Sequence, residues 1–265
     1  MPSPTCLNCN HALVGPYCSN CGQKADTRRI TFKNFLFNDI LHGTFSIERG
    51  MLYTAKQSLR RPGTAALDYI AGKRKPYYNL FLLSLFLFGL ILFLRHFYEV
   101  LATAQGSPLS TTPYKDEASI RLNTLIADQS KLVVFLFVPL AAVSSCILFR
   151  RRQLNLSEHF ILSGMVLLGI LLISAIGHLL FYLNLLTDAD VVSSIINIGT
   201  PLAAILYVGY GYVEAFGTLY SRWGMVYRIA LFFILLMVQV YLLLLILIGF
   251  VTNWKFGTVT LSPFG

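Results

Sequence analysis

Five long apolar segments constrain the fold of this chain more than any other feature of its sequence. Each is continuous and comes close to, or exceeds, the ~20 residues that a helix needs to cross the hydrocarbon of a bilayer. Only helices and closed barrels satisfy backbone hydrogen bonds inside lipid, and continuous rather than alternating apolar runs favour helices. The sequence therefore predicts an all-α membrane protein with about five transmembrane helices, at residues 77–94, 132–149, 160–186, 191–213 and 226–251.

Composition argues against the alternative that one of these segments is a buried core helix of a soluble protein. Only 12% of the 265 residues are charged and 55% are hydrophobic, whereas soluble domains carry about 25% charged residues. Exposing so much apolar surface to water would cost about 25 cal/mol per Å². Residues 1–30 contain no apolar segment of the signal-peptide type, so we expect the N-terminus to remain in the cytosol.

Positive charge is distributed unevenly around the five segments. With a cytosolic N-terminus, sixteen of the 21 Lys and Arg residues lie on the cytosolic side and five on the opposite side. Cytosolic loops of membrane proteins carry such an excess, which predicts a cytosolic N-terminus and an external C-terminus. Because the basic residues follow topology in this way, the net charge of +9 does not favour a nucleic-acid partner.

Four of the five cysteines form two CxxC pairs, Cys6 with Cys9 and Cys18 with Cys21. Two such pairs can present four thiolates to one tetrahedral metal ion, and a reducing cytosol favours metal binding over disulfides. The pattern predicts a zinc-ribbon-like module over residues 1–27 with structural Zn²⁺ as its cofactor. Iron and redox-active thiols are the alternatives. Four protein ligands close the coordination shell, so no catalysis is expected at the metal.

The residues around the cysteines indicate how this module folds. Asn10 and Gly22 each follow a CxxC pair and tolerate the left-handed backbone conformation expected there. Gly15 and Pro16 predict a turn that brings the pairs together. A module of about 20 residues cannot form a useful apolar core, so the metal would supply most of its folding free energy. The fifth cysteine, Cys146, is interpreted as a packing residue of the second apolar segment.

A basic, amphipathic cytosolic connector is predicted over residues 28–76, before the transmembrane domain at 77–265. Its five basic residues near the first span are candidates for contact with the membrane surface or with a partner: Arg60, Arg61, Lys73, Arg74 and Lys75. An anionic inner leaflet attracts each such residue by about 1 kcal/mol. Membrane anchoring is the simpler interpretation of these residues. Docking of a protein or a lipid headgroup is the more specific one.

Three helices are expected in the connector. Their signals are Thr and Gly residues in capping positions and apolar residues at helical spacing. The expected helices are one capped by Thr31, one over residues 46–59, and one over residues 65–71, capped by Thr64 and ended by Gly72.

The fourth apolar segment contains Asn197, Pro201 and Glu214, a candidate intramembrane polar site. Pro201 removes a backbone donor and is expected to kink the helix. Glu214 is expected near the inner membrane face. His178 lies about 27 Å along the third segment, near the outer face, so the two side chains should not meet.

Glu214 is therefore expected to pair with a cytosolic arginine, drawn from Arg150, Arg151, Arg152, Arg222 and Arg228. The same segment also carries small residues spaced by four, which permit close helix approach. These pairs are Gly199 with Ala203 and Gly211 with Ala215.

Several motifs lie within residues 6–78: the two CxxC pairs, Tyr17, Gly22-Gln23, Leu41-His42-Gly43, Arg61-Pro62-Gly63 and Tyr69-Ile70-x-Gly72-Lys73-Arg74. Together they resemble a bacterial family of uncharacterised membrane proteins that join an N-terminal zinc-ribbon-like module to several spans. Asn10 stands where the family often has a glycine. The resemblance implies this architecture and a location in the bacterial inner membrane, but no reaction.

No P-loop, GxSxG or HExxH motif is present in the sequence, which favours a non-enzymatic protein. The motif-rich cytosolic part favours an adaptor or assembly factor that docks a cytosolic protein partner through the zinc module. The alternative is a small-solute or ion transporter that uses the polar fourth span. No internal repeat of the kind common in transporters is evident.

Overall fold

The computed structural model describes residues 5–25, 27, 49–104, 134–187 and 190–252. Within these residues the chain is all-helical, and strand-like pairing is limited to two isolated bridges. The predicted helix capped by Thr31 lies outside the described residues. The helices are α2 (Arg49–Arg60), α3 (Pro62–Ile70), α4 (Leu80–Ala104), Val134–Leu148, η2 (Arg150–Arg152), α6 (Leu156–Thr187), α7 (Asp190–Phe216), η3 (Gly217–Leu219) and α8 (Arg222–Thr252).

Four helices, α4, α6, α7 and α8, are long and apolar enough to cross a membrane. They correspond to the first, third, fourth and fifth predicted spans. The second predicted span, residues 132–149, contains a shorter apolar helix, Val134–Leu148. At 1.5 Å per residue this helix is about 22 Å long, less than the ~30 Å of a hydrocarbon core. The prediction of a multi-span helical protein is therefore confirmed for four long helices among the described residues.

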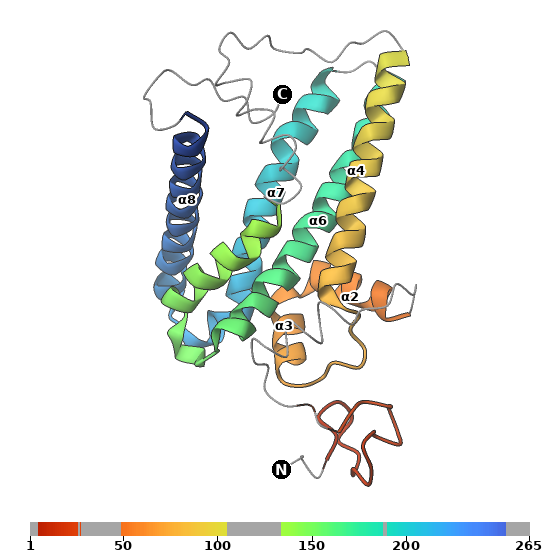
Figure 1. Cartoon of the computed structure of the whole chain (residues 1–265), viewed down its shortest axis with the longest axis vertical. Coiled ribbons are helices and arrows are strands. Elements are labelled where there is room, and N and C mark those ends of the chain that lie inside the picture. The colour runs from red at the N-terminus through yellow and green to blue at the C-terminus, as the bar shows by residue number, and fades with distance from the viewer. Residues whose placement is uncertain (1–4, 26, 28–48, 105–133, 188–189, 253–265) are drawn as a thin grey trace.

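The long helices run side by side, and both α2 and α3 lie across one end of them (Figure 1). The cysteine module lies beyond α2 and α3 at that same end, together with η2 and with the start of α8. Helix α6 lies between α4 and α7 and packs against both (Figure 1). The module and the short helices thus form one polar end of an apolar bundle.

The apolar core surrounds α6, while α8 lies at the periphery. Two thirds of the most apolar window of α6 is buried inside the protein, against 6% for α8. Rings from different helices stack near the polar end, with Phe149 and Phe216 4.6 Å apart between centroids. Phe232 connects α8 to this stack through Tyr212, at 4.4 Å. Helix α8 therefore presents most of its apolar surface outward, as expected for a helix that faces lipid.

Helix α3 begins earlier than predicted. Its first residue is Pro62, whose fixed φ and missing N–H suit the first helical position. Arg61 is the N-cap and makes no capping hydrogen bond with its side chain. Thr64 consequently lies inside the first turn, and the prediction that it caps the helix was wrong. Gly72 has a φ of +102° just after the helix, as the predicted end requires.

A reciprocal pair of hydrogen bonds fixes the start of α6. Asn155 Oδ1 accepts from the Glu158 backbone N–H, and Glu158 Oε2 accepts from the Asn155 backbone N–H, each at 2.8 Å. This arrangement is a capping box, in which two donors at the helix start gain partners. It explains why α6 starts at Leu156, four residues before the apolar segment predicted from hydropathy.

Candidate metal centre

The four cysteines of the two CxxC pairs converge on one point. Their sulfur atoms all lie within 4.8 Å of one another. Two of these separations are 3.6 Å between the Sγ atoms of Cys6 and Cys21 and 3.5 Å between those of Cys9 and Cys18. Sulfurs about 2.3 Å from a tetrahedral ion would lie about 3.8 Å apart, far beyond a disulfide bond of about 2.05 Å. The cluster therefore fits a metal ion bound by four thiolates.

Both CxxC pairs are built on the same backbone turn. The N–H of Asn10 donates to the Cys6 carbonyl, and the N–H of Gly22 donates to the Cys18 carbonyl, each at 2.8 Å. Asn10 has a φ of +58° and Gly22 a φ of +71°. The prediction of left-handed residues after each pair is thus confirmed. Each turn directs its two thiols to the same side, because the left-handed residue reverses the chain immediately after the second cysteine.

The cysteine thiols differ in acidity. Desolvation opposes ionisation of Cys21, but hydrogen bonds from the backbone of Gln23, from Asn8 and from neighbouring thiols lower its pKa to about 6. The backbone N–H of His11 favours the Cys9 thiolate, yet desolvation and thiol–thiol hydrogen bonds raise its pKa to about 11. Since metals bind thiolates rather than thiols, Cys21 is the ligand best prepared to receive an ion at neutral pH.

Lys75 approaches the module from the turn that precedes α4. A Cβ atom placed on Gly22 would lie 3.6 Å from its Nζ. A divalent ion held by four thiolates carries net negative charge, so a cation beside the module is favourable. Lys75 was predicted only as a contact for the membrane surface or a partner, and this position beside the module was not foreseen.

Gln23 fastens the module to the same turn. Its Nε2 donates to the Gly72 carbonyl at 2.8 Å, and its Oε1 accepts from the backbone N–H groups of Arg74 and Lys75, each at 3.2 Å. The Gln23 side chain is almost fully buried. Leu7 adds an apolar contact, because a Cβ on Gly72 would lie 2.6 Å from its Cδ1. The module is therefore held to the entrance of α4 by buried polar bonds.

Sequence reading missed this function of Gln23. The residue appeared only as part of the motif Gly22-Gln23, and its partners lie 49 to 52 positions further along the chain. The signal that could have found it is the joint presence of Gly22-Gln23 and Gly72-Lys73-Arg74 in one resemblance. A buried polar side chain needs partners, and backbone groups of a turn are suitable ones.

The other predicted surface contacts lie around α2 and α3. Lys73 forms an ion pair with Asp68 at 2.8 Å, which raises the pKa of the lysine. The Arg74 guanidinium lies over the Tyr69 ring, 5.5 Å from its centroid. Arg60 is exposed at the end of α2. The structure thus places Lys73, Arg74 and Lys75 in one turn.

Glu214 contacts the start of α3, which corrects the predicted partners. Its Oε2 accepts from the Gly63 backbone N–H at 2.9 Å, and its Oε1 accepts from the Thr64 hydroxyl at 2.6 Å. Its nearest arginine is Arg61, with Nε 3.9 Å from Oε1. The prediction of a partner among Arg150–Arg152, Arg222 and Arg228 was wrong. The carboxylate instead satisfies donors at a helix N-terminus, where negative charge is favourable.

Several of those arginines bind the ends of helices instead. Arg152 donates to the Ala215 carbonyl at 2.7 Å, and Arg228 donates to the Leu148 carbonyl at 3.2 Å. The last carbonyls of a helix have no partner within it, so arginine side chains there are stabilising. Hydropathy and charge counts cannot reveal this, because the acceptors are backbone atoms.

The small residues Gly211 and Ala215 do allow another helix to pack closely, and that helix is α3. A Cβ on Gly63 would lie 2.5 Å from the Ala215 nitrogen and 2.6 Å from the Gly211 carbonyl oxygen. The backbones of α3 and α7 therefore touch at Gly63. The second small pair differs, because a Cβ on Gly199 would meet nothing within 4 Å.

The candidate polar site in the fourth span is not brought together. Asn197 and Pro201 are exposed on α7, while Glu214 is partly buried against α3. Seventeen residues separate Asn197 from Glu214, which is about 25 Å along a helix. The buried polar groups lie elsewhere, with the Ser145 hydroxyl 2.8 Å from His159 Nδ1 and the Ser163 hydroxyl 3.1 Å from that of Tyr212. These bonds join neighbouring helices.

One family model matches the chain, over residues 48–94, and its description is "Protein of unknown function (DUF3667)". The matched segment contains α2, α3, the turn that receives Gln23 and the first part of α4. No curated protein and no solved structure matches the chain. The similarity and the long apolar helices fit an integral membrane protein, and they supply no reaction.

Proposed function

We propose that this chain is a non-enzymatic adaptor or assembly factor that docks a cytosolic protein partner through its N-terminal module. One observation carries the proposal. The module is fastened to the entrance of α4 through the buried Gln23, while Val14 and Tyr17 on its connecting loop are 98% and 62% exposed. Two apolar side chains on a rigid loop, close in sequence and far from lipid-facing helices, suit recognition by a protein.

The proposed cofactor is structural Zn²⁺. A tetrahedral cluster of four thiolates with no open position suits zinc, which has no redox chemistry of its own. Binding would order a module too small to fold by its own apolar contacts. The zinc would therefore supply rigidity to the loop that carries Val14 and Tyr17, and no chemical step.

The proposed location is the bacterial inner membrane, with a cytosolic N-terminus, an external C-terminus and five spans. The module, α2, α3 and η2 share one end of the bundle (Figure 1), which supports a single cytosolic face. Arginines crowd the same end, as the positive-inside rule requires. The span proposed at residues 132–149 would use the helix Val134–Leu148.

A photo-crosslinking amino acid at position 14 tests the adaptor function in intact cells. The partner should form an adduct through position 14, and the adduct should disappear when Cys6, Cys9, Cys18 and Cys21 are all changed to Ser. The same crosslinker at Lys56, an exposed position of α2, is the matched control. Membrane levels of all variants are equalised first. Equal adducts from positions 14 and 56, or an adduct that survives loss of the cysteines, would contradict docking through the module.

Transport through the fourth span receives less support. The Glu214 carboxylate is engaged by the start of α3, and Asn197 lies far from it along α7. A transporter would need these groups to share a solvated path. Solute flux in proteoliposomes that depends on Glu214, and is lost in Glu214→Gln, would favour transport over the adaptor.

A further inference from the structure

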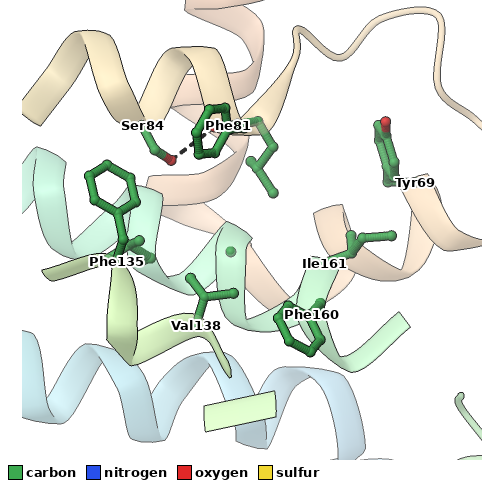
Figure 2. Close-up of a pocket in the computed structure, with 10 residues that line it drawn as sticks. Tyr69, Phe81, Ser84, Phe135, Val138, Phe160 and Ile161 are labelled. Atoms are coloured by element: carbon green, nitrogen blue, oxygen red, sulfur yellow. Dashed lines mark hydrogen bonds between the residues drawn. The ribbon is translucent and has the colours of Figure 1, made fainter. Parts of the chain in front are cut away.

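A small apolar groove lies between α3, α4, the helix Val134–Leu148 and α6. Its volume is about 60 Å³, well below the 300 Å³ or more typical of sites for drug-sized soluble ligands. Figure 2 shows Tyr69 on one side of the lining and Phe135 on the other, with Phe160 and Ile161 between them. The groove is thus small, and its lining comes from four helices.

The lining offers no polar group to a ligand from the α4 side. Ser84 is the one hydroxyl among the α4 residues that line the groove, and it donates to the Leu80 carbonyl at 2.9 Å, the dashed line in Figure 2. Phe135, Val138 and Phe160 are only partly buried, so the groove reaches the protein surface. A small apolar groove that opens on the side of a membrane helix suits a hydrocarbon chain.

The groove lies at the end of the bundle that carries the module. Phe81 and Ser84 belong to the first two turns of α4, and Ile161 and Gly164 belong to the first turns of α6. The turn between α3 and α4 lies just beyond them (Figure 1). This depth corresponds to the upper acyl chains and headgroups of the proposed cytosolic leaflet.

The Arg74 guanidinium lies beside the groove. Tyr69 lines the groove, and the Arg74 guanidinium lies over its ring and donates to its carbonyl at 3.4 Å. The backbone N–H of Arg74 is held in turn by Gln23. The nearby Asp68 is paired with Lys73, so it adds no unpaired negative charge. The apolar groove and the cation are therefore neighbours.

We propose that this groove holds part of one acyl chain of an anionic phospholipid, with the phosphate bound at Arg74. This inference goes beyond the adaptor function, because it assigns a specific lipid to one place on the molecule. A guanidinium binds phosphate oxygens through paired N–H donors. The apolar groove beside it distinguishes a bound lipid from general attraction to a charged surface.

Native mass spectrometry of the full chain tests the proposal, with equal amounts of phosphatidylglycerol and phosphatidylethanolamine of the same acyl chains added in detergent. The wild type should retain one phosphatidylglycerol in preference to phosphatidylethanolamine. Arg74→Gln should lower the retained fraction about fivefold, the effect of one basic residue near an anionic surface. Arg222→Gln, an exposed arginine at the start of α8, is the matched control and should behave as wild type.

Filling the groove tests the position of the acyl chain. Val138→Phe and Ser84→Leu both narrow it without touching Arg74, and each should abolish retention of the lipid. Equal retention of both lipids by the wild type, or equal losses for Arg74→Gln and Arg222→Gln, would overturn the headgroup assignment. Full retention by folded Val138→Phe or Ser84→Leu would overturn the groove as the site of the chain.

Discussion

At the scale of single residues, the cysteine thiols of the module differ widely in pKa. Cys21 accepts hydrogen bonds that lower its pKa to about 6, whereas the pKa of Cys9 is raised to about 11. A backbone N–H lowers the pKa of both thiols and desolvation raises both, whereas the hydrogen bonds between thiols raise the pKa of Cys9 and lower that of Cys21. The pKa of Cys18 is lowered as well, so both thiols with a lowered pKa belong to the second CxxC pair.

This inequality predicts selective alkylation of the chain after metal removal. Because a lowered pKa means that the thiolate is present above that pH, Cys21 should react with iodoacetamide at pH 7 and lose reactivity as the pH falls through about 6. Cys9 should react slowly throughout this range, since its pKa is about 11. Peptide mass spectrometry over pH 5 to 8 measures both residues in one sample. Equal rates for the two thiols would show that the metal-free module does not keep these hydrogen bonds, which would contradict the pKa difference in the metal-free chain.

Some residue positions could be predicted from the sequence and others could not. Asn10 and Gly22 were predicted because a left-handed residue after a CxxC pair is a local requirement. Gln23 was not, because its partners are backbone atoms about fifty positions away. The predicted partner of Glu214 was wrong, because its actual donors, the Gly63 N–H and the Thr64 hydroxyl, lie far away in the sequence and carry no charge.

At the scale of helices, the backbones of α3 and α7 approach each other closely at Gly63. Pro62 starts α3, Gly63 lacks the side chain that would collide with α7, and Glu214 accepts from the Gly63 backbone N–H. Steric fit and capping act at the same place. The short helix is thereby fixed against the bundle.

Replacement of Gly63 by alanine tests this contact. The added Cβ would lie 2.5 Å from the backbone of α7, so the helices must separate, at a cost of about 1–3 kcal/mol. We expect the apparent Tm of the detergent-purified chain to fall by several degrees. Gly89→Ala in α4 is the matched control, because nothing lies within 4 Å of its added Cβ. An equal Tm for the two variants would show that α3 does not touch α7 at Gly63.

Helix identity was predicted well, because length and apolarity are local properties of the sequence. The four long helices overlap the predicted segments, although α4 continues ten residues beyond its predicted end at residue 94. Helix α6 starts early because of its capping box. The segment at 132–149 was predicted as a full span, but its described helix is shorter. Helix contacts such as that of Gly63 with Ala215 could not be predicted, since hydropathy carries no information about which helices meet.

At the scale of the whole molecule, one turn joins the four-cysteine module to the helical bundle. The turn receives Gln23 and Leu7 from the module, and it continues directly into α4. Its neighbour α3 is fastened to α7 by Glu214. A well-ordered module should therefore also keep the turn before α4 well ordered, because the two contact each other directly.

The most direct test of this coupling is hydrogen–deuterium exchange of the full chain in nanodiscs. The amides of Arg74 and Lys75 are protected by Gln23 Oε1. Both chelation of the metal and Gln23→Ala should speed their exchange about two- to tenfold, the equivalent of one net hydrogen bond. Gln57→Ala in α2 serves as the control and should leave exchange of this turn unchanged. The result that contradicts the account is exchange at residues 72–76 that stays the same after chelation and in Gln23→Ala.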